Sequence, residues 1–248
     1  MHYLCAALVL ALTLLAQGST YLHRAADLDA RTLRSDSQVA VSETVDYWLF
    51  SPVKRGAPAA LVFIPGASVE PTAYAPLAHE VAQRGYKSYV LKLPPPSGSL
   101  DAHKASGVAR AKAVITADRA VPRWLVAGHS LGGAIAAQFV REHPDMVAGY
   151  VLIGTTHPTA LDLSSLDLDA TKVVATEDPI ASEVKSRLNA HLLPKSTRWL
   201  RVEGGNHSQF AWYDRQQGDG VATITRDRQQ EITTGAIVAA LARIAGSR

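Results

Sequence analysis

The sequence predicts an α/β fold in which a mostly parallel β-sheet carries helices on both faces. From Val39 onward, short β-rich runs alternate with helix-like stretches, an alternation typical of parallel sheets. Several of the runs are apolar throughout, as expected for strands covered on both faces. No linker or internal repeat interrupts the pattern, so residues 39–248 are expected to form a single domain. The expected strands are an alternating one at 45–49 and the runs 60–65, 88–93, 124–128, 149–154, 172–176 and 198–202.

The expected helices end at residues that interrupt helices. They span 71–84, 105–120, 131–143, 181–193 and 225–244. Gly85 ends the first helix, and prolines follow the next three. Thr225 is suited to cap the N-terminus of the last helix, because its hydroxyl can accept a hydrogen bond from a free backbone N–H there.

The composition is that of an ordinary globular protein. With 248 residues, 47% hydrophobic and 19% charged, the chain can bury a substantial core and is not of the disordered type. The net charge of +3 is mild and the basic residues are scattered, which argues against a nucleic-acid partner. The single cysteine, Cys5, excludes an internal disulfide, and no cluster of histidine, cysteine or carboxylate residues indicates a metal site.

The first 22 residues form an apolar segment that carries no charge. Residues 3–16 have the length of a signal-peptide core, and Ala16-Gln17-Gly18 places small residues at cleavage-like spacing. No Lys or Arg precedes this core, and with residues 17–22 included the segment is just long enough to anchor in a membrane. We therefore expect residues 1–22 to be a signal peptide or an N-terminal membrane anchor, and the protein to be exported or membrane-anchored. The alternatives are a buried N-terminal helix and a cytoplasmic protein.

The strongest chemical signal is the string Gly128-His129-Ser130-Leu131-Gly132. A Gly-x-Ser-x-Gly string is weak evidence by itself, but this one lies where a β-rich run ends and a helix of small residues begins. That setting is the one a nucleophile elbow requires. The sharp turn holds the Ser130 hydroxyl out at the edge of the sheet, and the flanking glycines remove Cβ atoms that would collide. Ser130 is therefore expected to be a catalytic nucleophile.

A serine nucleophile needs a general base, and the base needs an acid to orient it. In this topology the acid and then the histidine follow the serine, each in a loop after a strand. The run 172–176 leads into Glu177 and Asp178, and the run 198–202 leads into the loop that bears His207. Asp178 is preferred as the acid because it lies further into its loop, and Glu177 is the alternative. Either carboxylate can instead cap the helix that follows.

The tetrahedral intermediate of such a reaction needs two preorganised hydrogen-bond donors. One is normally the backbone N–H of the residue after the serine, here Leu131. The other comes from the loop after an early strand, and Ala67 is expected to supply it. No cofactor is needed for this chemistry.

The other histidines and the aromatic residues near His207 have weaker assignments. His129 is expected to pack beside the sheet, and His157 follows a strand and is a candidate for lining the cleft. The histidines on or beside helices are expected at the surface: His79, His103, His143 and His191. The residues expected to shape the substrate pocket are Phe210, Trp212 and Tyr213.

Several blocks of the sequence resemble the α/β-hydrolase superfamily, and more narrowly its compact group of "alpha/beta hydrolase family" proteins. The resemblance runs from about Val39 to the C-terminus. It implies the α/β-hydrolase fold, with Ser130 as nucleophile, Asp178 as acid and His207 as base. The blocks are FIPGASVEPTAYAPLAHEVAQRGY, GHSLGG, TEDP, EGGNHSQF and QQGDGVATITRDRQQ.

Two departures from the wider superfamily narrow the expected activity. The oxyanion loop lacks the His-Gly-Gly-Gly motif of many lipases and esterases. Only residues 155–170 separate two expected strands at the place where many relatives insert a helical lid, so little or no lid is expected. We therefore expect a serine hydrolase, a carboxylesterase acting on small or exposed ester substrates through an acyl-enzyme. The alternatives are a thioesterase, amidase or acyltransferase with the same triad, or a non-catalytic binding protein of the same fold.

Overall fold

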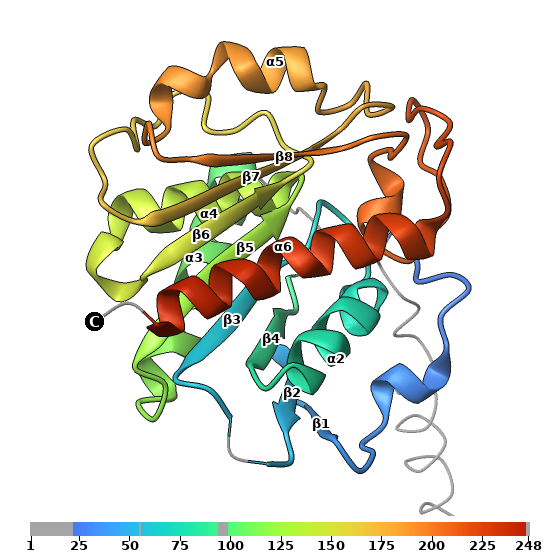
Figure 1. Cartoon of the computed structure of the whole chain (residues 1–248), viewed down its shortest axis with the longest axis vertical. Coiled ribbons are helices and arrows are strands. Elements are labelled where there is room, and N and C mark those ends of the chain that lie inside the picture. The colour runs from blue at the N-terminus through green and yellow to red at the C-terminus, as the bar shows by residue number, and fades with distance from the viewer. Residues whose placement is uncertain (1–21, 55, 94–98, 247–248) are drawn as a thin grey trace, which may run out of the picture.

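The computed structural model describes residues 22–54, 56–93 and 99–246. The strands in these ranges are β1 (Val39–Glu43), β2 (Tyr47–Pro52), β3 (Ala59–Ile64), β4 (Lys87–Leu91), β5 (Arg123–His129), β6 (Gly149–Ile153), β7 (Asp169–Ala175) and β8 (Arg198–Val202). They form one sheet in the order β1-β2-β4-β3-β5-β6-β7-β8 (Figure 1). The pairs β1–β2 and β2–β4 are antiparallel and all other neighbours are parallel. The predicted α/β fold with a mostly parallel sheet is therefore confirmed.

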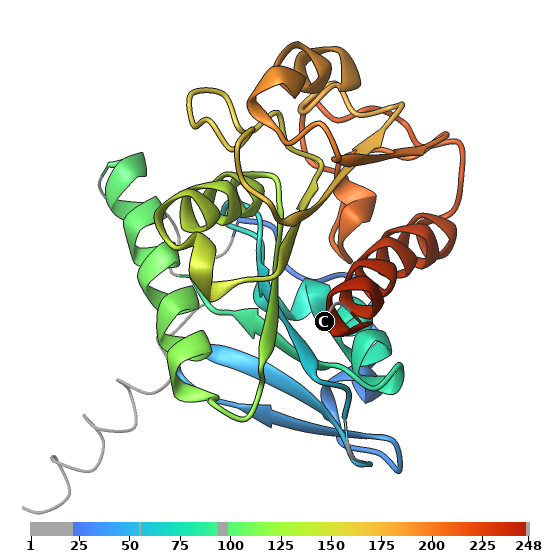
Figure 2. The ribbon, with the colours of Figure 1, turned by 60° about the vertical axis from the view of Figure 1, so that its left-hand side comes forward.

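Helices cover both faces of this sheet (Figure 2). On one face lie α2 (Ala75–Gln83) and α6 (Arg226–Gly246), and on the other α3 (Leu100–Ala117) and α4 (Leu131–Glu142). The short helix α5 (Glu183–Leu188) follows β7. Single turns of 3-10 helix complete the fold: η1 (Ala30–Leu33), η2 (Pro71–Tyr74), η3 (Pro144–Met146), η4 (Ala190–Leu192) and η5 (Ser208–Phe210).

The N-terminal apolar segment predicted at residues 1–22 lies outside the described residues, apart from Leu22. Among the helices of the described ranges, none is both long enough and apolar enough to cross a bilayer.

The largest differences from the predicted elements lie at three places. The edge strand β1 was not expected, and Val45, which was placed in a strand, is 83% exposed in the turn between β1 and β2. Helix α3 begins five residues earlier than predicted, because the Ser99 side chain accepts a hydrogen bond from the Ala102 N–H and caps it. The predicted helix 181–193 is shorter, since α5 ends at Leu188 and a single turn, η4, follows.

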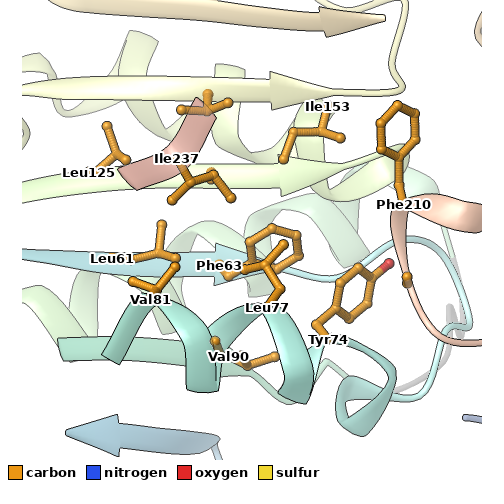
Figure 3. Packing of buried hydrophobic residues seen from close by; sticks show 14 of the residues in the cluster. Leu61, Phe63, Tyr74, Leu77, Val81, Val90, Leu125, Ile153, Phe210 and Ile237 are labelled. Atoms are coloured by element: carbon orange, nitrogen blue, oxygen red, sulfur yellow. The ribbon is translucent and has the colours of Figure 1, made fainter. Parts of the chain in front are cut away.

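Two apolar cores flank the sheet. The core under α2 and α6 includes Phe63, Leu77 and Ile237, all fully buried (Figure 3). Figure 3 also shows Tyr74 and Phe210 at one end of this core, where the strands end. The core under α3 and α4 is built mainly from aliphatic residues of the opposite strand faces. Burial on both sides explains why the central strands are apolar throughout.

Two histidines predicted at the surface are buried instead. His79 is 8% exposed on the inner face of α2, where its ring meets Phe50 edge-on and its Nε2 lies 3.3 Å from Asp36 Oδ2. His103 is 6% exposed. It lies one helical turn before Gly107 on the inner face of α3, and it appeared peripheral only because the helix starts earlier than the sequence indicated.

Lys172 on β7 is a buried lysine. Its side chain is 1% exposed, and its Nζ donates a hydrogen bond to the main-chain oxygen of His157. Burial lowers the pKa of Lys172 from the ordinary 10.5 to about 7. Between these pH values the unfolded chain holds a proton that the folded protein has released. The free energy of unfolding therefore rises with pH across this window, and the cost of burying the charge is fully present below it.

Lys172→Met is expected to raise the melting temperature most at low pH. Below pH 7 the substitution removes a desolvation cost on the order of several kcal/mol, offset by about 1 kcal/mol for the lost hydrogen bond. At pH 9 part of this cost has been lost, because the unfolded lysine releases its proton more readily there, so the gain should shrink. Thermal unfolding of both proteins from pH 6 to pH 9 measures the difference. Lys195→Met, at an exposed position, is the control and should show no such pH dependence. A gain in melting temperature that stays constant with pH would contradict the lowered pKa of Lys172.

Candidate active site

The Ser130 turn joins β5 to α4. Its N–H donates a 3.0 Å hydrogen bond to the Ile153 oxygen of β6, and its backbone has φ 54° and ψ −119°. A positive φ at a residue with a side chain costs on the order of 1–3 kcal/mol and persists only where the surroundings enforce it. The side chain is half-buried at the carboxyl edge of the sheet. This backbone is the strained turn that an elbow serine needs.

Two glycines let the strand and the helix of this turn close together. A Cβ on Gly128 would lie 2.1 Å from the Gly132 oxygen, and a Cβ on Gly132 would lie 2.0 Å from the Ile64 oxygen. Both obstacles are backbone atoms, so no change of side-chain rotamer can relieve them. The prediction that these glycines remove colliding Cβ atoms is confirmed.

Gly132→Ala is expected to destabilise the protein by more than about 4 kcal/mol or to prevent folding, because the methyl group must displace β3 from α4. The matched control is Gly235→Ala in α6, where an added Cβ meets nothing within 4 Å. There alanine should stabilise the helix by up to about 1 kcal/mol. Urea unfolding of the two variants measures both effects. Similar free energies of unfolding would mean that the strand and the helix can separate without loss.

His207 and Asp178 form a buried pair beside this turn. His207 Nδ1 lies 2.8 Å from Asp178 Oδ2, and the two side chains are 1% and 0% exposed. The ring centroid of His129, the residue before Ser130, is 4.6 Å from that of His207. Within the described residues, no hydrogen bond joins the Ser130 hydroxyl to His207. Such a bond often tightens only when substrate is present.

The structure separates the two candidate acids. Asp178 is buried, and its second oxygen accepts the Ala181 N–H at 2.8 Å, so the carboxylate both orients His207 and closes the turn after β7. Glu177 is exposed, and its side-chain hydrogen bond is with its neighbour Thr176. The geometry therefore favours Asp178.

A second buried carboxylate, Asp219, accepts hydrogen bonds from the loop that carries His207. It accepts the N–H groups of His207 at 3.0 Å and of Ser208 at 2.7 Å, and the Ser208 hydroxyl at 2.6 Å. It also accepts the N–H of Gly220. Asp219 was missed in the sequence, where it stands between two glycines and reads as a turn residue. Its contacts explain Ser208, for which the sequence suggested no role.

Gln229 of α6 binds the backbone of the same loop through two hydrogen bonds. Its amide oxygen accepts the Asn206 N–H at 3.0 Å, and its amide nitrogen donates to the Asn206 oxygen at 2.7 Å. The Asn206 side chain in turn donates to the Gly220 oxygen at 2.9 Å. The residue before His207 is thus fixed by paired hydrogen bonds inside the protein. Loop residues held this way give the imidazole a defined position without local secondary structure.

The expected oxyanion donors are the backbone N–H groups of Leu131 and Ala67. Leu131 is the first residue of α4, so its N–H has no acceptor within the helix. Ala67 follows β3 in an exposed position, and its N–H has no hydrogen-bond acceptor within the described residues. The preceding Gly66 N–H is instead bound by the Tyr74 hydroxyl at 3.0 Å. Both expected donors are therefore free to bind a ligand oxygen.

The aromatic residues after His207 differ in their burial. Phe210 and Tyr213 are 1% and 0% exposed and belong to the core under α2 and α6. Phe210 packs on His129, with ring centroids 5.6 Å apart. Trp212 is half-buried, with the Arg226 guanidinium 5.4 Å from its ring centroid. The side chains of Phe210 and Tyr213 therefore pack in the core, and their expected part in shaping the substrate pocket stays a prediction.

An N-terminal segment that the sequence did not connect with the site, residues 22–27, runs between its two loops. The His23 N–H donates to the Ser68 oxygen at 3.0 Å, and the Ala26 N–H donates to the Trp212 oxygen at 2.9 Å. The His23 ring lies 5.2 Å from the Tyr213 ring. Burial, and then repulsion from His207, lower the pKa of His23. The segment therefore ties the loop after β3, which contains Ala67, to the loop that carries His207.

Comparison with known proteins assigns the chain to a family. The sequence profile described as "Alpha/beta hydrolase family" matches residues 60–231, more than half of the chain. The chain belongs to the alpha/beta hydrolase family. The matched range includes Ser130, Asp178 and His207.

Solved structures of similar fold include several esterases. An esterase of Pyrobaculum calidifontis has a TM-score of 0.67 at 16% identity, covering 87% of this alpha/beta hydrolase and 88% of its own chain. A bacterial heroin esterase has a TM-score of 0.60 at 15% identity, covering 98% and 91%. Esterase 2 of Thermogutta terrifontis has a TM-score of 0.56 at 17% identity, covering 82% and 90%. At these identities the similarity shows the fold.

A curated relative is similar over a shorter stretch. A non-heme haloperoxidase-like protein of Mycobacterium phage D29 is 33% identical over 106 residues, which is 42% of this chain and 37% of the relative. The match thus spans little more than a third of that relative's length. Within the described residues, no three His, Cys, Asp or Glu side chains gather as metal ligands would.

Proposed function

We propose that this alpha/beta hydrolase is a serine hydrolase that cleaves carboxylic esters, with Ser130 as nucleophile, His207 as general base and Asp178 as the orienting acid. The observation that supports the proposal most is the buried 2.8 Å pair of His207 Nδ1 and Asp178 Oδ2 beside a strained elbow serine. A buried carboxylate on Nδ1 keeps the proton on that nitrogen and leaves the Nε2 lone pair free to accept a proton. Cofactors are not required for this chemistry.

In the proposed reaction, His207 Nε2 takes the proton of the Ser130 hydroxyl as Oγ attacks the ester carbonyl carbon. The carbonyl oxygen becomes an oxyanion, which the N–H groups of Leu131 and Ala67 bind. Collapse of the intermediate expels the alcohol, which receives the proton from His207, and leaves an acyl-serine. Water then attacks the acyl group as His207 takes its proton, and the acid product leaves as that proton passes to Ser130 Oγ. Asp178 orients His207 and stabilises the imidazolium in both halves.

The connection between β6 and β7 supports a preference for small or exposed esters. Residues 155–168 contain no helix, so no helical lid stands over the site from this connection. Thioester and amide hydrolysis and acyl transfer would use the same side chains. A non-catalytic binding protein of the same fold is the rival of a different class.

A fluorophosphonate probe tests the proposal directly. We expect the probe to label the protein once, and peptide mapping to place the label on Ser130. A panel of p-nitrophenyl esters of increasing chain length, with matched thioesters and amides, should show the fastest turnover for short esters. Failure to label with any serine-directed probe, together with no turnover across the panel, would support the binding-protein alternative. Faster turnover of a thioester would move the proposal to that substrate class.

A further inference from the structure

The Tyr74 hydroxyl lies at the end of the core where the strands end, between two segments of the candidate site (Figure 3). Tyr74 is the last residue of η2 and is 0% exposed. Its Oη accepts the Gly66 N–H at 3.0 Å and lies 2.9 Å from His129 Nδ1. A Cβ on Gly66 would lie 3.2 Å from both of these polar atoms, so the three groups are closely packed.

The positions of the protons on the Tyr74 hydroxyl and the His129 imidazole follow from their burial and contacts. Burial holds the pKa of Tyr74 well above 10 and, with repulsion from His207, holds the pKa of His129 well below 6.5. The tyrosine therefore keeps its proton and the imidazole of His129 is neutral. Within the described residues the only group beside the Tyr74 hydroxyl that can accept its proton is His129 Nδ1, so the O–H donates to that nitrogen. The chain then runs from the Gly66 N–H to the Tyr74 hydroxyl to His129 Nδ1, and His129 carries its proton on Nε2.

Each end of this chain is one residue from a group with a proposed catalytic role. Gly66 precedes Ala67, whose N–H is the proposed second oxyanion donor, and His129 precedes Ser130. Ala67 is exposed, so its position depends on the buried residue before it. The Tyr74 hydroxyl is therefore a direct hydrogen-bonded connection between the oxyanion loop and the elbow.

We propose that Tyr74 is a positioning residue that fixes the oxyanion loop relative to the nucleophile through Gly66 and His129. The inference rests on the proposed serine-hydrolase function. Without the hydroxyl, a buried N–H and a buried ring nitrogen lose their partner, and the loop can relieve this only by moving. Oxyanion hydrogen bonds form fully only in the transition state, so a displaced loop lowers kcat and leaves KM nearly unchanged.

Tyr74→Phe tests the proposal, and Tyr150→Phe is a matched control. Both tyrosines are fully buried, but the Tyr150 hydroxyl has no hydrogen-bond partner within the described residues. Losing a whole oxyanion donor costs about 10²–10³ in kcat, so a displaced one should cost about 10- to 100-fold. We expect this fall in Tyr74→Phe for a short p-nitrophenyl ester, with KM within about twofold of wild type. Binding of a trifluoromethyl ketone, which forms a tetrahedral adduct, should weaken in parallel. Tyr150→Phe should match wild type in all three measurements.

A wild-type kcat in Tyr74→Phe, or a loss confined to KM, would overturn the inference while leaving the serine-hydrolase proposal standing. A wild-type protein that neither turns over esters nor labels with fluorophosphonate would overturn both. If Tyr74→Phe does not fold, the wild-type protein itself decides through ¹⁵N NMR of its histidines. A hydrogen bond between His129 Nδ1 and the Tyr74 hydroxyl supports the proposal, and an Nδ1 without a hydrogen bond overturns it.

Discussion

Ser130→Ala is expected to lower kcat by about 10⁶-fold and to leave the fold intact. The substitution removes the atom that forms the acyl-enzyme in the proposed mechanism. It leaves the oxyanion donors and the substrate contacts, which support only a small residual rate. Alanine occupies the same backbone position, so the turn keeps its hydrogen bond to the Ile153 oxygen. Steady-state ester hydrolysis and fluorophosphonate labelling measure the loss, and a melting curve verifies the fold.

Ser88→Ala is the matched control for this substitution. Ser88 is a fully buried strand serine whose hydroxyl has no hydrogen-bond partner within the described part of the chain. Its removal should leave both kcat and labelling at the wild-type level. Wild-type turnover in Ser130→Ala would exclude the acyl-enzyme mechanism, and labelling of another serine would move the nucleophile there.

The sequence locates the candidate triad because each member lies in the turn or loop that follows a strand. Parallel strands place their carboxyl ends at one edge of a sheet, so residues that follow different strands meet there whatever their separation in the chain. Asp178 and His207 are 29 positions apart, yet their contacting atoms are 2.8 Å apart. The glycines around Ser130 were predictable for a related reason. A tight strand-to-helix turn has few sequence solutions, and the obstacles are backbone atoms present in any sequence.

The contacts that hold these residues in place could not be predicted from the sequence. Asp219 reaches His207 from a loop twelve residues further along the chain, and Gln229 reaches Asn206 from the first turn of α6. Asp219 stands in a loop, and Gln229 is a polar residue on the buried face of a helix, so neither follows a strand or stands out as apolar. Tyr74 is predictable as a core residue from its helix face, whereas its hydroxyl contacts depend on how η2 packs against two other segments. Side-chain hydrogen bonds between distant loops leave no local signal in the sequence.

Asp178→Asn is expected to lower kcat by about 10⁴-fold while the protein stays folded. The asparagine can keep both contacts, with its oxygen accepting the Ala181 N–H and its NH₂ facing His207 Nδ1. An NH₂ donor at that position requires an unprotonated Nδ1, so the imidazole proton moves to Nε2. The nitrogen that must accept the Ser130 proton is then blocked. The same change removes the charge that stabilises the imidazolium, so kcat should fall far more than KM changes.

Glu177→Gln separates this mechanism from the alternative acid. Glu177 is exposed and hydrogen-bonds to Thr176, so its neutralisation should change kcat by less than about threefold, the scale of a solvent-screened charge. ¹⁵N NMR of His207 in Asp178→Asn would show the proton on Nε2, and that result distinguishes a wrong tautomer from a collapsed site. A loss of activity in Glu177→Gln as large as in Asp178→Asn would make Glu177 the acid. Full activity in both variants would mean that the Asp178–His207 pair serves the fold, because the buried imidazole would then need no carboxylate to act as a base.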